Sequence, residues 1–278
     1  MLGFLNRTMD ARPLGLGRIL VGLASLPIAL EWAIPLLKAA SGDYLVLPVF
    51  DGWKTLPDTA VLILLAISLV SSLAMILGIA GRLPSLLVAV CGAVAILSDQ
   101  QAYSNHLLLL VMLSFFIGVS GATNAISISA GINKTQEVPY WPAFLIKMQI
   151  TTVYAWTAAA KVNDQYLAGD VLRMNLQPWV PVPDHLLPAI AMSSIAAEAF
   201  LAVALWIPKL RLLAFMVGGA LHLGIVLTLI QPAPLIPFGL LMMTGYVLFA
   251  HDSILNGRWN MTSFGRRSRS PSMTGVRE

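Results

Sequence analysis

The chain has 278 residues, of which 58% are hydrophobic and 11% are charged, and its mean hydropathy is +0.80. These values exclude an ordinary soluble domain and indicate an integral membrane protein with room for several spans of about 20 residues each. The net charge of +4 comes with no basic stripe interleaved with aromatic residues, so we expect membrane lipid and no nucleic acid as a partner. A single cysteine, Cys91, excludes an internal disulfide and a cysteine-based metal cluster.

Apolar segments of near-membrane length follow one another along the chain, each bounded by Pro, Gly, Asn or charged residues. They cover residues 14–37, 60–79, 83–98, 107–122, 143–160, 188–207, 212–230 and 233–250. Because every backbone amide needs an internal partner in hydrocarbon, these segments are predicted to be helices. The predicted fold is all-α, a polytopic membrane bundle of about eight transmembrane helices that occupies residues 1–252.

The basic residues predict the orientation of this bundle. With the N-terminus inside and eight spans, only four of the 17 Lys and Arg residues lie outside, namely Lys38, Lys54, Lys161 and Arg173. Both termini are therefore predicted to be cytoplasmic. The basic, Ser-rich segment 253–278 is predicted to be a disordered cytoplasmic tail.

Three side chains that can donate or accept a proton are predicted to meet on the outer side of the membrane. Asn105 and His106 open the fourth predicted helix, whose start faces the same side as the end of the fifth. Tyr154 and Lys161 lie about two turns apart on one face of the fifth helix, and Lys161 ends it. We therefore expect Tyr154, Lys161 and His106 to converge.

The same residues carry a resemblance to a known family. An Asn-His pair opens one helix, a later helix contains Tyr154 and ends at Lys161, and the run Tyr166-Leu167-Ala168-Gly169 follows. Glu198 in one later helix and His222 in the next complete the pattern. Over roughly residues 10–250 the chain resembles the HTTM (horizontally transferred transmembrane) family, which includes the membrane domain of vitamin K-dependent gamma-carboxylase.

The resemblance implies a reaction and assigns roles. Lys161 would be the base that deprotonates reduced vitamin K, a menaquinol-like lipid quinone, and His106 would support carboxylation of glutamate in a secreted peptide. Tyr154, Asn105, Glu198 and His222 would form the cofactor pocket. A lysine ammonium has an ordinary pKa of about 10.4, and desolvation beneath an apolar ligand favours its neutral form. The resemblance therefore implies quinol epoxidation and glutamyl carboxylation in a bacterial inner membrane, with the site on the outer side and no metal.

Other interpretations of these residues stay open at this stage. Lys161 is also suited to anchoring a helix end, His106 to a helix start, and Tyr154 to packing. Glu198 and His222 are the strongly polar residues within their segments, and a hydrogen bond between them would satisfy both, either as a structural lock or as part of a cofactor pocket or proton relay.

These open interpretations leave alternative functions. The carboxylase continues after its membrane helices into a large soluble region, whereas here only the tail 253–278 follows. A non-catalytic membrane scaffold or maturation partner of a secreted peptide, working with a soluble partner protein, is therefore the alternative to the enzyme. A transporter is the third hypothesis.

Overall fold

The structure, a computed structural model, describes residues 7–50, 52, 55–122, 125–128 and 136–255. Eight long helices of 16 to 29 residues make up most of this described part. They are α1 (Arg12–Ala40), α2 (Asp58–Leu77), α3 (Leu83–Ser98), α4 (Asn105–Ser120), α5 (Trp141–Ala160), α8 (Leu187–Ala204), α9 (Arg211–Thr228) and α10 (Leu235–Leu255). The short elements are β1 (Thr8–Asp10), β2 (Glu137–Pro139), α6 (Asp164–Leu167), α7 (Asp170–Asn175) and two 3-10 turns, Gln100–Ala102 and Asp184–Leu186.

Each apolar segment predicted from the sequence coincides with one long helix. The fourth begins slightly earlier than predicted, because the hydroxyl of Ser104 accepts a hydrogen bond from the backbone N–H of Leu107 and so caps α4 at Asn105. The last helix continues to Leu255, past the predicted domain end at residue 252. Of the predicted tail, 253–278, the residues from 256 on lie outside the described part of the chain.

Four helices of the described part are long and apolar enough to cross a membrane: α1, α2, α9, and α8 extended by the turn before it. Helices α3 and α4 and residues Leu235–His251 of α10 are shorter apolar helices. Helix α5 has 20 residues but carries the polar residues Lys147 and Gln149. The predominantly helical membrane character is thus confirmed, with four candidate spans.

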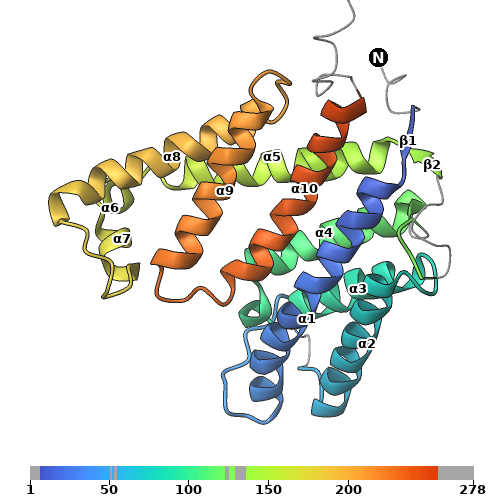
Figure 1. The fold of residues 1–278 in the computed structure, drawn as a ribbon. Coiled ribbons are helices and arrows are strands. Elements are labelled where there is room, and N and C mark those ends of the chain that lie inside the picture. The colour runs from blue at the N-terminus through green and yellow to red at the C-terminus, as the bar shows by residue number, and fades with distance from the viewer. Residues whose placement is uncertain (1–6, 51, 53–54, 123–124, 129–135, 256–278) are drawn as a thin grey trace, which may run out of the picture.

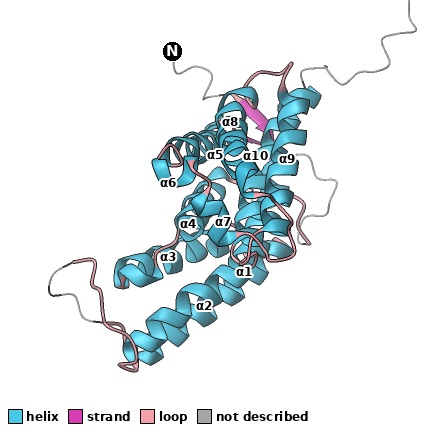
Figure 2. Cartoon of the chain, turned by 90° about the vertical axis from the view of Figure 1, so that its left-hand side faces the viewer, coloured by secondary structure: helices cyan, strands magenta, loops and turns pink. Residues whose placement is uncertain are grey.

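Helices α1 to α4 pack together, as do α5, α8, α9 and α10. Contacts of α1 and α4 with α10, and of α4 with α5, join the two groups. Helix α1 packs against both α2 and α10, α3 packs against α4, and α5 pairs with α8 (Figure 1). The strands β1 and β2 pair antiparallel, with Met9 opposite Val138. Figure 2 shows these strands at the opposite end of the bundle from the loop that joins α1 to α2. At the strand end, the guanidinium of Arg12 donates to the Asp10 carboxylate and holds the pKa of that carboxyl below its usual range.

A buried arginine holds the connection between α4 and α5 at this end. Arg18 on α1 is 1% exposed, and its Nη2 donates to the backbone oxygens of Ala125 at 3.3 Å and Ile126 at 2.7 Å. Gly78 ends α2 with a φ of +71°, and a Cβ there would lie 2.2 Å from Nη1 of Arg18 and 2.4 Å from Cβ of Ser127. Only glycine therefore lets α2 end against this arginine.

We predict that Gly78→Ala destabilises the protein strongly, because it adds a clash with Arg18 and Ser127 to the cost of a positive φ. Gly81→Ala is the matched control, since Gly81 has a φ of +61° but nothing within 4 Å of its Cβ position. The expected loss of unfolding free energy is about 3 kcal/mol for Gly78→Ala and about 1 kcal/mol for Gly81→Ala. Thermal unfolding in detergent micelles measures both, and equal melting temperatures would contradict the clash.

Candidate functional site

A charged pair joins the end of α5 to the middle of α8. Nζ of Lys161 lies 2.7 Å from Oε1 of Glu198, whose residue is 5% exposed. The second carboxylate oxygen, Oε2, is buried and has no hydrogen-bond partner within the described residues. A buried carboxylate needs compensation, so the lysine stabilises Glu198, while the remaining oxygen keeps an unused acceptor site.

Local structure directs the lysine inward. Lys161 follows the last residue of α5, and the chain then reverses because Oδ1 of Asn163 caps α6 by accepting from the backbone N–H of Tyr166. The Tyr166 ring centroid lies 5.4 Å from Nζ of Lys161, and its hydroxyl lies 2.8 Å from Oγ of Ser194 on α8. The turn therefore covers the ammonium with an aromatic face and ties α6 to α8.

A second polar group links α5, α9 and α10. The Tyr154 hydroxyl lies 2.8 Å from Nε2 of His222 and 2.7 Å from the Tyr246 hydroxyl. Tyr154 is 2% exposed, so these bonds satisfy a phenol that has no access to solvent. The three side chains can pass a proton along hydrogen bonds, because each can both donate and accept one.

The two polar groups are neighbours. Lys161 and Tyr154 share one face of α5, where Lys161 bonds Glu198 and Tyr154 bonds His222. The hydrogen bond considered between Glu198 and His222 does not form. The long lysine side chain reaches Glu198 from the helix end, and His222 bonds Tyr154 instead.

His106 belongs to a different pair. Its Nε2 lies 2.8 Å from the Glu31 carboxylate on α1 and 3.1 Å from Oγ of Ser104. The predicted convergence of Tyr154, Lys161 and His106 is therefore wrong, because the histidine bonded to Tyr154 is His222, while His106 pairs with Glu31. Asn105 opens α4, and its Oδ1 accepts from the Tyr103 hydroxyl at 3.1 Å.

An apolar groove between α9 and α10 reaches this polar group. Its volume is about 650 Å³, and its walls include Phe215, Leu223, Leu235 and Met243. His222 and Tyr246 contribute its hydrogen-bonding groups. The groove therefore suits an apolar ligand with a polar head that meets a histidine and a tyrosine.

Tyr246 is a site residue that the sequence analysis missed. It lies in an apolar segment in which it and Thr244 carry the hydroxyl groups, and that isolated phenol was the available signal. Gly218 on α9 makes room for it, because a Cβ at this glycine would lie 1.8 Å from the Tyr246 hydroxyl oxygen. Within the described part of the chain, no three His, Cys, Asp or Glu side chains are placed to hold a metal ion.

Comparison with known proteins gives one match. The family model described as the HTTM domain matches residues 6–253. No curated protein and no solved structure matches the chain.

We predict that Gly218→Ala displaces the Tyr246 hydroxyl and breaks its bond to Tyr154. The expected loss of unfolding free energy is about 1–3 kcal/mol, from overpacking and from an unsatisfied buried hydroxyl. Gly219→Ala is the control, since the neighbouring Gly219 also lines the groove but has nothing within 4 Å of its Cβ position. Thermal unfolding of the two variants checks this, and an equal effect would show that Gly218 has no special role.

Proposed function

The chain belongs to the HTTM family of membrane domains, and we propose that it is a membrane enzyme that acts on a reduced lipid quinone at Lys161 and Glu198. The family is linked to vitamin K-dependent carboxylase, so the proposed reaction drives carboxylation or a related modification of a secreted peptide. The observation that carries the proposal is the ion pair of Lys161 with the buried Glu198 carboxylate, beside a hydrogen-bonded group whose members His222 and Tyr246 border an apolar groove.

The groove between α9 and α10 supports a lipid substrate. Its walls are apolar, and neighbouring residues such as Leu227 and Met243 are more than half exposed, as expected for a surface that faces lipid. A quinone ring can enter sideways from the bilayer with its isoprenoid tail along the helices. His222 and Tyr246 would orient its oxygens, because both can donate a hydrogen bond to a carbonyl or accept one from a hydroxyl.

The ion pair supports proton removal. A lysine must be neutral to act as a base, and at 2.7 Å the ammonium proton can pass from Nζ to Oε1 of Glu198. Lys161 then accepts the hydroxyl proton of the ligand. When bound, the reduced quinone supplies that proton and the reducing power of the reaction.

We propose eight spans with both termini cytoplasmic in a bacterial inner membrane and the Lys161 pair on the outer side. The positions of the helix ends along the chain support this orientation. Consecutive long helices place His106, at the start of α4, and Lys161, at the end of α5, on the same side if both helices cross. The basic residues of the connections after α2 and after α8 then lie inside.

We predict opposite accessibility for Gly42→Cys and Gly81→Cys in a Cys91→Ser background. Both glycines have positive φ and open space around the Cβ position, so the two variants are matched. A membrane-impermeant maleimide should label residue 42 in intact cells and residue 81 only after the inner membrane is permeabilised. Labelling of both residues from the same side would disprove an odd number of crossings between them.

We predict that Lys161→Gln lowers quinol-dependent turnover at least about 100-fold, since it removes the base. Glu198→Gln should cause a comparable loss because it removes the proton acceptor. Lys38→Gln is the control, because Lys38 also lies at the end of its helix and contacts a tyrosine ring at 4.7 Å.

The measurement uses purified protein in nanodiscs with reduced vitamin K, oxygen, bicarbonate and candidate peptides, followed by chromatography of quinone and peptide products. If the wild-type protein shows no quinol-dependent turnover with any candidate peptide, the proposed enzymatic activity is refuted. Normal peptide maturation in cells that carry Lys161→Gln at normal abundance would favour the scaffold.

A further inference from the structure

A second cavity lies on another face of α5. It has a volume of about 240 Å³ and is bounded by the start of α4, by α5 and by the start of α10. Its α5 wall consists of Gln149, Thr152, Val153, Trp156 and Thr157, which follow helical spacing. Helix α5 therefore presents the Tyr154 and Lys161 side chains on one face and a mixed polar cavity on the next.

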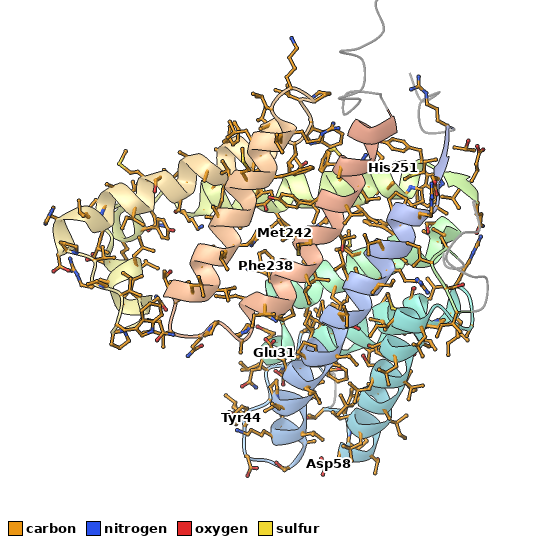
Figure 3. All side chains as sticks on the ribbon, viewed as in Figure 1. Glu31, Tyr44, Asp58, Phe238, Met242 and His251 are labelled. Atoms are coloured by element: carbon orange, nitrogen blue, oxygen red, sulfur yellow. The ribbon has the colours of Figure 1, made fainter. Side chains whose placement is uncertain are left out.

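Phe238 separates the cavity from the groove between α9 and α10. Its side chain lines the cavity, and its ring centroid lies 6.1 Å from that of His222, which lines the groove. Figure 3 shows Phe238 in the first turns of α10, beneath Met242. A ligand in the cavity and a ligand in the groove would therefore lie on opposite sides of one aromatic ring.

The cavity offers both donors and acceptors of hydrogen bonds. Oδ1 of Asn105 accepts from Tyr103, which leaves its amide N–H groups available. The Thr152 hydroxyl donates to the backbone oxygen of Met148 at 3.0 Å, which leaves its oxygen as an acceptor. The Gln149 side chain is half-buried, and its amide has no hydrogen-bond partner in the part of the chain that the structure describes.

These groups need a polar occupant if α5 crosses the membrane. Lipid chains cannot hydrogen-bond an amide, so an unpaired Gln149 in hydrocarbon would cost free energy. None of the ten lining residues carries a charge. A carboxylate would find no cation and an ammonium no anion among them, whereas a carboxamide presents the same mixture of donor and acceptor as the cavity wall.

The mouth of the cavity faces outward from the bundle. Trp156 is 72% exposed and Tyr103 is 50% exposed, and both line the cavity. Exposed tryptophan and tyrosine side chains are typical of the boundary between lipid and water. A ligand that carries both apolar and amide groups can therefore enter from this boundary.

We propose that this cavity binds an uncharged carboxamide group, carried either by a small amide or by a glutamine or asparagine side chain of a peptide. The site is distinct from the Lys161 pair and from the groove, and its assignment does not rest on quinone chemistry.

The test measures binding of N-acetylglutamine methylamide to the protein in nanodiscs without quinone, by equilibrium dialysis at pH 7. The glutamate and lysine analogues of this probe differ in charge at nearly constant size, and we expect both to bind at least ten-fold more weakly. Equal or tighter binding of the glutamate analogue would overturn the proposal. A second probe is an alanine nonapeptide with a central glutamine, and failure of both glutamine probes to bind would also overturn the proposal. Tighter binding of that nonapeptide identifies a peptide as the source of the amide, and equal binding identifies a small amide.

Variants locate the binding site. Gln149→Leu and Thr152→Val remove hydrogen-bonding groups at nearly constant volume, and each should weaken binding of the glutamine probe, Gln149→Leu by at least ten-fold. Thr228→Val is the matched control, because Thr228 bonds the carbonyl one turn earlier, as Thr152 does, but lies outside the cavity lining. Wild-type affinity in Gln149→Leu would place the probe elsewhere and refute the site. Lys161→Gln should leave probe binding unchanged, so a failure of this proposal is distinguishable from a failure of the quinol reaction.

Discussion

The carboxylate of Glu198, buried between helices, needs a cation, and much of the site is arranged around that requirement. An uncompensated charge at such a position costs several kcal/mol, so the end of α5 must deliver Lys161 to α8. The turn after α5, capped by Asn163, places Tyr166 against the same ammonium. The pairing of α5 with α8 thereby fixes where a base and its proton acceptor lie.

Helix α5 combines structural and chemical roles because its polar residues are divided among its faces. Tyr154 and Lys161 meet α8, α9 and α10, whereas Gln149 and Thr152 line the cavity toward α4. Helix α5 is not among the four candidate membrane spans of the described residues. A helix surrounded by neighbours can carry such groups, because other helices provide the partners that lipid cannot.

The sequence predicted the helices better than the contacts between them. Hydrophobic length and the residues that bound each segment were enough to locate all eight long helices, since these are local properties. The common face of Tyr154 and Lys161 followed from helical periodicity alone. The choice of His222 over His106 as the histidine bonded to Tyr154 did not, because it depends on which helices are neighbours and how each is rotated. The roles of Tyr246 and Phe238 escaped prediction for the same reason.

Composition and periodicity by themselves determined the membrane environment, the helical class and the position of Lys161 at a helix end. Each of these depends on composition or on residues close together in the chain. The tertiary structure decided the partner of that lysine. Glu198 lies on another helix, and its distance from Lys161 depends on how α5 and α8 pack. Packing likewise created the apolar groove and the polar cavity on either side of Phe238, since a cavity is a property of several helices at once.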